Sequence, residues 1–346
     1  MLASMHPSFP ARRRSARFVA ALTTVALSLT LAACGGDDEA KKKPSSQPVE
    51  GGTELAALWP LTGQPVKGAT PNRPVLVAKI DNTGSSKPQL GLKRADLVTE
   101  VLVEGGMTRL AVFFYQHLPK VAGPVRSMRA SDIGIVKPAH GLIVASGGAE
   151  GTVARMKRAK VPFVTEGGPG FFRAGSRSAP YNLMVNMPKL AKAKQKKAVV
   201  PASYLPWGKE SDFKGTRAAK SIDAKFSRST TTSWRYKGGK YRNQNSYAAA
   251  GGQFVPDSIL VVRVKQKDAG YRDPAGNYVP ETIYVGKGKM MLFHKGKVVG
   301  GTWRKGSRQT PIKLSTTSGP VKVPAGHVWI ELVPINKDGG KVTYRK

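Results

Sequence analysis

The stretch ADLVTEVLVEGGMTRLAVF, residues 95–113, decides the fold of this 346-residue chain. Two runs rich in β-branched and aromatic residues, 98–104 and 107–114, lie on either side of Gly105-Gly106. Glycine adopts positive φ without strain, so a Gly-Gly pair between two such runs predicts a two-residue hairpin turn. A helix through residues 95–104 is the rival interpretation, and the β-branched content and the glycine pair disfavour it. The stretch therefore predicts a pair of antiparallel strands.

A two-residue turn would fix the register of this hairpin, with Glu104 opposite Met107 and Leu102 opposite Arg109. Side chains alternate between the two faces of a sheet, and directly opposed residues share a face. One face then carries a mostly polar set: Glu100, Leu102, Glu104 and Arg109. The other face carries an apolar set with one hydroxyl: Val101, Val103, Thr108 and Leu110. We therefore expect the charged residues of the hairpin to lie together.

Other charged and amide side chains join this set as candidate ligand-binding residues. Asp81 and Asn82 end a predicted buried strand at 74–80, and Arg126 and Arg129 are three residues apart, which would place them side by side on a helix. The full candidate set is Asp81, Asn82, Glu100, Glu104, Arg109, Arg126, Arg129 and Asn182. Guanidinium groups of this kind bind an acidic sugar, a phosphate or a peptide carboxylate through paired hydrogen bonds.

Two other interpretations of the set stay open. Glu100 and Glu104 are the alternative catalytic residues, as the acid and base of a glycosidase-like pair, because side chains two apart on a strand face one way. In the structural interpretation the arginines neutralise the glutamates and hold the fold. No metal site or cofactor is predicted, since Asp81, Asp96, Asp132 and Glu150 lack EF-hand-like spacing and the histidines are scattered.

The chain divides into two folded parts by composition. Residues 58–190 mix strands with short helices at 127–137, 152–160 and 189–197, which predicts an α+β or α/β domain with a mixed sheet. A basic interdomain linker is expected at 191–222. Residues 223–336 carry regularly spaced short strands with Gly and Pro between them, which predicts a mainly antiparallel β domain, a sandwich or a barrel. Residues 337–346 read as a polar tail.

The first 57 residues predict export and a lipid anchor. Four arginines precede an apolar run at 18–33 of about 16 residues, shorter than the roughly 20 that span a bilayer. The run ends in Leu31-Ala32-Ala33-Cys34, which is similar to a bacterial lipobox. Residues 1–33 are thus expected to be a lipoprotein signal peptide, Cys34 the site of lipid attachment, and 34–57 a disordered tether. An ordinary secretory signal with a chance cysteine is the alternative.

The charge of the chain indicates its class of partner. The net charge is +35, and the first 33 residues hold four arginines and no acid, which leaves +31 on the rest. Outside the membrane such a charge attracts anionic lipid headgroups, phosphate-bearing wall polymers or acidic glycans, and no nucleic acid is expected there. A protein partner is an alternative. A further alternative is that the charge only keeps the protein soluble.

Several motifs together resemble the YerB-like lipoprotein family, a two-part domain of unknown function. They are PLTG at 60–63, IDN at 80–82, the stretch at 95–113, GPVRSMR at 123–129, SAPYN at 178–182, GGTWR at 300–304 and GHVWIELVP at 326–334. The resemblance implies a mixed first domain, a β second domain and a lipid anchor, and it carries no established catalytic mechanism.

We therefore expect a membrane-anchored extracytoplasmic lipoprotein that binds an anionic envelope component or a protein partner without catalysis. The alternative is an envelope glycan hydrolase or transferase that uses Glu100 and Glu104.

Overall fold

The computed structural model describes residues 57–195, 200–273, 276–335 and 340–346. The predicted hairpin forms from β2 (Leu97–Leu102) and β3 (Thr108–Phe114), with a 3-10 turn, η3 (Glu104–Gly106), between them. Gly105 and Gly106 have φ values of 65° and 71°, which is the conformation that glycine was expected to supply.

The register of the hairpin differs from the prediction by one residue. Leu102 pairs with Thr108, Val101 with Arg109 and Glu100 with Leu110, because the turn is longer than two residues. A shift of one residue moves a side chain to the opposite face of the sheet. The prediction that Glu100 and Arg109 share a face is therefore wrong, and the two lie on opposite sides.

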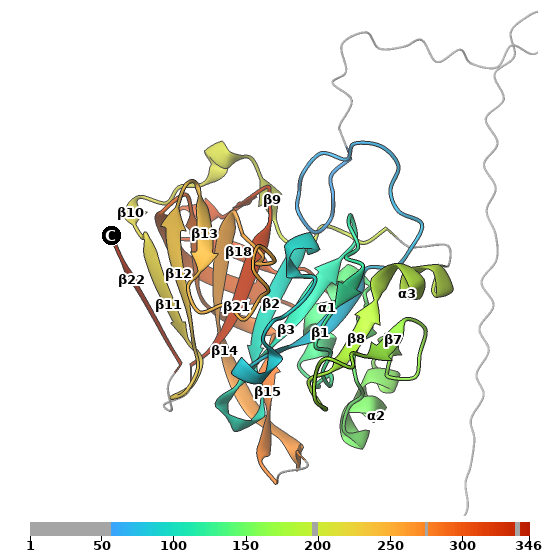
Figure 1. The fold of residues 1–346 in the computed structure, drawn as a ribbon. Helices are drawn as coiled ribbons and strands as arrows, with labels where there is room; N and C mark the ends of the chain where they lie inside the picture. The colour runs from blue at the N-terminus through green and yellow to red at the C-terminus, as the bar shows by residue number, and fades with distance from the viewer. Residues whose placement is uncertain (1–56, 196–199, 274–275, 336–339) are drawn as a thin grey trace, which may run out of the picture. The chain divides into compact units, whose positions relative to one another are not determined.

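The hairpin belongs to a 13-stranded sheet that draws strands from both halves of the chain (Figure 1). On one side β3 pairs with β1 (Leu76–Asn82), which runs parallel to β5 (Leu142–Val144), and β5 pairs with β6 (Phe163–Val164). On the other side β2 pairs in parallel with β21 (Val328–Pro334), and β21 with β14 (Ser258–Arg272). The two sequence regions thus meet inside one sheet.

The N-terminal half is mixed, as expected. Its helices are α1 (Asp132–Val136), α2 (Glu150–Arg158) and α3 (Met187–Ala193). Asn186 caps the N-terminus of α3, where its side chain accepts a hydrogen bond from the Lys189 amide. Short 3-10 turns are η1 (Gly84–Ser86), η2 (Leu92–Arg94) and η4 (Lys137–Ala139). A separate three-stranded sheet consists of β4 (Val121–Ala122), β8 (Leu183–Asn186) and β7 (Phe171–Arg173).

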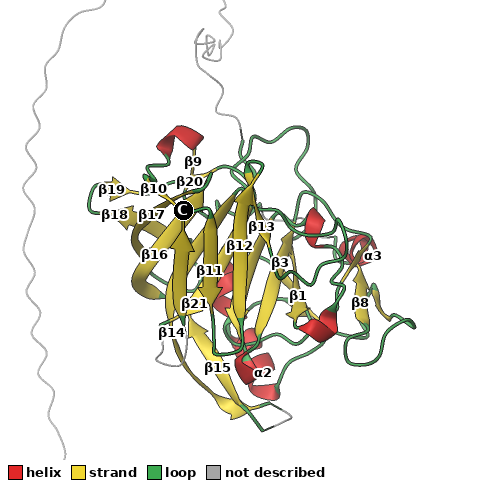
Figure 2. Cartoon of the chain, turned by 60° about the vertical axis from the view of Figure 1, so that its left-hand side comes forward, coloured by secondary structure: helices red, strands yellow, loops and turns green. Residues whose placement is uncertain are grey.

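The C-terminal half is mostly antiparallel strands. β14 pairs with β15 (Tyr278–Ile283) and β16 (Gly286–His294), and the sheet continues through β17 (Lys297–Lys305), β18 (Lys313–Thr316) and β19 (Gly319–Pro320). A second, four-stranded sheet consists of β13 (Lys240–Asn243), β12 (Thr231–Lys237), β11 (Ser221–Lys225) and β22 (Lys341–Arg345) (Figure 2).

The segments predicted to be an interdomain linker and a polar tail carry short elements. Within the expected linker lie β9 (Trp207–Gly208), η5 (Glu210–Asp212) and β10 (Arg217–Ala218), and β9 pairs with β20 (Val323–Pro324) while β10 pairs with β17. The expected polar tail contains β22, which pairs with β11. The strand is difficult to recognise in the sequence because only Val342 and Tyr344 pack against the core, and its other side chains are exposed.

The large sheet is covered on both faces. Val77, Val101 and Phe113 belong to one apolar cluster, and Ala78, Val98 and Val112 belong to another that includes residues of the four-stranded sheet. Every residue of β2 and β3 is buried. Polar side chains in these strands must therefore find partners inside the protein, since an unpartnered buried polar group costs about 1–3 kcal/mol.

Candidate functional site

Polar residues gather at one end of three central strands of the sheet, where β1 and β2 end and β3 begins. Asp81 lies opposite Arg109, and the next pair along is Asn82 and Thr108. Because neighbouring residues of a strand face opposite ways, Asp81 and Arg109 share one face and Asn82 and Thr108 the other. The site therefore has two sides, one ionic and one neutral.

The ionic side, which we call the ionic cluster, consists of Lys79, Asp81, Glu104, Arg109, Arg126, Arg129 and Asp132. At its centre Glu104 accepts a 2.9 Å hydrogen bond from Arg129 Nε and lies 3.3 Å from Arg109 Nη2. Burial alone would raise the pKa of Glu104, but the Arg129 hydrogen bond and the charges of Arg109 and Arg129 outweigh it and lower the pKa to about 2. Glu104 is thus a carboxylate at any physiological pH.

The outer parts of the ionic cluster are equally paired. Lys79 Nζ contacts Asp132 Oδ1 at 2.6 Å, and both side chains are almost fully buried. Asp132 also accepts the Arg129 backbone amide at 2.7 Å, so its carboxylate joins the start of α1 to Lys79 of β1. Arg126 Nε lies 3.0 Å from Asp81 Oδ2, and its guanidinium stacks on the Tyr181 ring.

Burial also affects the cations of the cluster. It lowers the pKa of Arg109 to about 10, and the nearby Arg129 charge adds to the effect. Burial lowers the pKa of Lys79 as well, and Asp132 opposes that change. Each of these cations faces a carboxylate, so an added anion would have to displace a buried partner. This geometry favours the interpretation in which the network holds the fold.

The neutral side centres on two buried carboxyl groups. Glu100 accepts hydrogen bonds from Asn82 Nδ2 at 3.0 Å and from Thr232 Oγ1 at 2.9 Å. Glu331 lies beside it on β21, in register, and accepts a 2.8 Å bond from Trp234 Nε1. Both are fully buried, and no donor among the described residues faces Glu331 Oε2.

A proton shared by Glu100 and Glu331 fits this arrangement. Burial raises the pKa of both groups, and the charge of Glu100 raises that of Glu331 further. Sequence reasoning missed Glu331, although a glutamate within the apolar run VWIELVP was a signal for a buried carboxyl. It also missed Lys79, although a lysine within the apolar run PVLVAKI was the same kind of signal.

The predicted site residues are thus divided among separate places. Glu104, Arg109 and Arg129 meet, as do Asp81 and Arg126, whereas Asn82 and Glu100 face the other side. Asn182 accepts a bond from Arg173 on β7, in the small sheet. Glu100 and Glu104 lie on opposite sides of the sheet, so the expectation that they act on one bond from a shared face is wrong. Cys34 lies outside the described residues.

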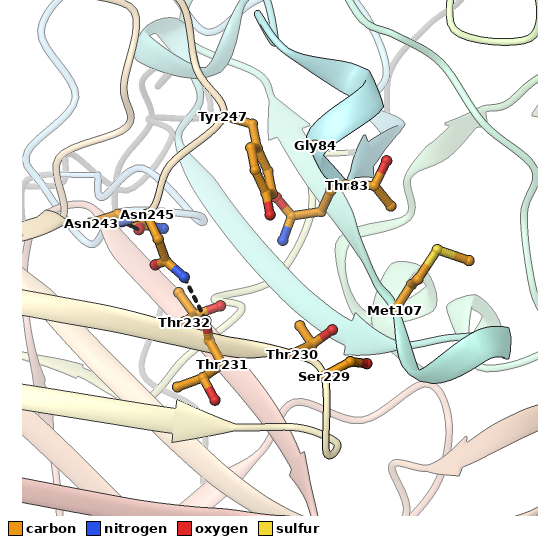
Figure 3. Close-up of a pocket in the computed structure, with 11 residues that line it drawn as sticks. Thr83, Gly84, Met107, Ser229, Thr230, Thr231, Thr232, Asn243, Asn245 and Tyr247 are labelled. Atoms are coloured by element: carbon orange, nitrogen blue, oxygen red, sulfur yellow. Dashed lines mark hydrogen bonds between the residues drawn. The ribbon is translucent and has the colours of Figure 1, made fainter.

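A cleft opens above the neutral side (Figure 3). It measures about 260 Å³ and lies between the end of β1, η3 and the strands β12 and β13. We call it the polar cleft, because most of its lining side chains are hydroxyls or amides: Asn82, Thr83, Ser229, Thr230, Thr231, Thr232, Asn243 and Asn245. Asn82 and Thr232, which bond Glu100, form part of its wall.

Two further hollows are lined by cations. The arginine pocket, of about 360 Å³, is lined by Lys137, Arg155, Arg158 and Arg308. The lysine groove, of about 650 Å³, is lined by Arg263, Lys265, Lys287 and Lys289 around Met290 and Met291. Sequence reasoning missed both, because each combines residues from distant parts of the chain and no local motif marks them.

Replacing Glu104 tests the role of the ionic cluster. Glu104→Gln leaves Arg109 and Arg129 buried without their counter-charge, and we expect it to lower the free energy of unfolding by about 3–5 kcal/mol. Glu166→Gln is the matched control, because its pair with Arg173 is exposed and is worth about 1 kcal/mol or less. Urea denaturation at pH 7 measures both. Equal, small effects would contradict a structural role for Glu104.

Replacing Glu331 tests the shared proton. The raised pKa values mean that the folded state holds more protons than the unfolded state, so this contribution is complete below pH 4.5 and is lost as pH rises through the folded pKa. Glu331→Gln cannot ionise, so we expect its free energy of unfolding to fall less between pH 5 and pH 9 than that of the unchanged protein. Parallel pH profiles of the two proteins would contradict the shared proton.

Comparison with known proteins agrees with the fold and the motifs. Residues 61–200 match the family model described as "Protein of unknown function (DUF3048) N-terminal domain", and 222–330 match the corresponding C-terminal domain. Over 142 residues the chain is 30% identical to "Putative lipoprotein YerB" of Bacillus subtilis (strain 168), which covers 40% of this chain and 43% of that relative.

A solved structure shows the same fold. The crystal structure of YerB from Bacillus subtilis matches with a TM-score of 0.69 and 20% identity, over 83% of this chain and 99% of that one. Among the described residues, no helix is both long and apolar enough to cross a bilayer. With both domains present and a homologous relative, the chain belongs to the YerB-like family of two-part DUF3048 proteins, whose function is uncharacterised.

Proposed function

We propose that this chain is a lipoprotein, anchored at the extracytoplasmic face of the membrane, that binds an anionic component of the cell envelope without chemically changing it. The observation that carries the proposal is the contrast between two sets of cations. Those of the ionic cluster face buried carboxylates, whereas those of the lysine groove line an accessible hollow. The relative's name, a lipoprotein, supports the anchor.

The lysine groove supplies unpaired positive charge. Arg263 donates to the backbone carbonyls of Pro334 and Gly340, at 2.7 Å each. Lys265, Lys287 and Lys289 make no ion pair with any residue that the structure describes. Three ammonium groups around an apolar floor suit a phosphate or carboxylate group carried on a less polar body, such as a lipid headgroup or a wall polymer.

The arginine pocket is a weaker second anion site. Its Arg155 and Arg308 lie 3.0 and 3.4 Å from Glu281, a buried carboxylate that Lys267 also approaches. One carboxylate therefore opposes three cations, and Lys137 and Arg158 add to the excess. The surplus strengthens long-range attraction to anionic surfaces, which is screened beyond about 8 Å at physiological salt.

A catalytic alternative based on Glu100 and Glu104 gains no support from these positions. Glu104 is held as a carboxylate between two arginines, and Glu100 is fully buried among Asn82, Thr232 and Glu331. A glycosidase pair needs an acid and a base on either side of one sugar bond. A protein partner with an acidic surface would use the same cations, and binding assays distinguish it from a phosphate ligand.

Neutralising the lysine groove tests the binding proposal. The triple variant Lys265→Gln, Lys287→Gln and Lys289→Gln should bind vesicles of phosphatidylcholine with phosphatidylglycerol, and soluble polyphosphate, roughly 100-fold more weakly, because each basic residue near an anionic surface contributes about 1 kcal/mol. The unchanged protein should also release both probes as salt rises. Sedimentation measures the vesicles and calorimetry the polyphosphate.

The matched control is a second triple variant with the same net charge as the groove variant. Lys189→Gln, Lys192→Gln and Lys194→Gln change three lysines in and just after α3, away from the groove. We expect this triple variant to bind nearly as well as the unchanged protein. Equal losses of affinity in both variants would show that binding depends on overall charge alone and would contradict a site in the lysine groove. No binding of either probe at low salt would contradict the binding proposal as a whole.

The mass of the membrane-extracted protein tests the anchor. We expect a chain that begins at Cys34 and carries at least two acyl chains, because one chain alone anchors only marginally. Cys34→Ala should leave residues 1–33 attached and remove the acyl mass, as measured by intact mass spectrometry. An unmodified full-length chain in the cytosolic fraction would contradict the anchor.

A further inference from the structure

We propose that the polar cleft binds an uncharged sugar residue. The polar cleft shares no lining residue with the arginine pocket or the lysine groove. The inference therefore does not depend on the anion proposal. It rests on the chemistry of the lining, on how firmly the lining is held, and on the size of the space.

The lining of the polar cleft carries no charge. None of its side chains belongs to Asp, Glu, Lys, Arg or His, although such charged residues other than histidine make up 22% of the chain. Hydroxyl and amide groups donate and accept hydrogen bonds, as sugar hydroxyls do. An anion would find no cation here, and an apolar ligand would leave these groups without partners. The lining therefore matches a neutral, hydroxyl-rich ligand.

The walls of the cleft are fixed before any ligand arrives. Asn82 donates to Glu100 and to Thr108, at 3.0 and 2.9 Å, and accepts a 3.0 Å bond from Gln89. On the opposite wall Asn245 accepts the Ser233 amide at 3.0 Å and donates to the Thr231 carbonyl at 2.6 Å. Side chains that are already ordered lose little entropy on binding, which favours affinity.

Other groups in the cleft are available to a ligand. The amide nitrogen of Asn243 and the hydroxyl of Tyr247 have no hydrogen-bond partner among the described residues. In Figure 3 the Tyr247 ring projects between Asn245 and Thr83. An aromatic ring offers an apolar face to the C–H groups of a sugar and a hydroxyl to its rim. These groups give the cleft both contacts that a pyranose ring needs.

The size and openness of the cleft limit the ligand to about one ring. Its volume of about 260 Å³ is just below the roughly 300–1,000 Å³ of ordinary ligand pockets. Gly84, Ser229 and Asn245 on its rim are exposed, so a glycan chain can continue out of the cleft on either side of the bound residue. A single neutral sugar within a longer glycan is the ligand that fits.

Saturation-transfer NMR on the full chain in detergent tests the proposal. The probes are the methyl glycosides of glucose, galactose, mannose and N-acetylglucosamine, with methyl glucuronide as the charged comparison, each at about 10 mM because one small ring binds weakly. We expect a signal from at least one neutral glycoside and a weaker one from the glucuronide. No signal from any neutral glycoside would overturn the proposal.

Two variants and a control connect the signal to the cleft. Tyr247→Ala and Tyr247→Phe should each reduce it by about fivefold or more, the loss expected for one neutral hydrogen bond. Tyr247→Phe keeps the ring and removes only the hydroxyl, and so guards against misfolding of the first variant. Tyr278→Ala removes an exposed tyrosine on β15 and should change nothing. A signal that survives both cleft variants would overturn the proposal.

The lysine-groove triple variant separates this inference from the anion proposal. It should keep the full sugar signal while it loses polyphosphate binding, because the two sites share no residue. A sugar signal that falls with the groove lysines would overturn the assignment to the cleft.

Discussion

The alternation of side chains along β1, β2 and β3 is the constraint on which the rest of the structure depends. All three strands lie in a sheet covered on both faces, so each polar residue must be satisfied on its own side. Asp81 and Arg109 share one face with Lys79, and there they build the ionic cluster. Asn82 and Thr108 share the other with Glu100, where amide and hydroxyl groups surround the buried carboxyl. A register shift of one residue would place charges against neutral groups on both sides.

This separation of charge explains why a strongly basic chain keeps a stable interior. Inside, Glu104 and Asp132 face the buried cations, and burial raises the pKa of both Glu100 and Glu331, which lie side by side. The excess of basic residues lies outside, where water and salt screen it. The lysine groove and the arginine pocket are the places where that excess meets an accessible hollow, and the polar cleft is a hollow that the excess does not reach.

The sequence predicted the presence of elements better than their geometry. The hairpin at 95–113 was recognisable because the Gly-Gly pair requires positive φ, but its register depended on whether the turn holds two residues or more, which two glycines do not decide. The contact of β2 with β21 joins residues more than 200 positions apart, and no local pattern announces it. The predicted common face of Glu100, Glu104 and Arg109 is therefore wrong, and Asn182 lies beside the small sheet rather than with them. Lys79 and Glu331 are single charged residues within apolar runs, and this pattern could have predicted that both side chains are buried.

We propose that anions bind to the basic surface, whereas the ionic cluster stabilises the fold. Hydrogen–deuterium exchange of the full chain, with and without soluble polyphosphate, tests it most directly. We expect slower exchange in the backbone around Arg263 and Lys265 and in β16, with no change at 100–109 or 126–132. Protection centred on Glu104, Arg109 and Arg129 would contradict it, because the ligand would then enter the cluster that the structure shows already paired.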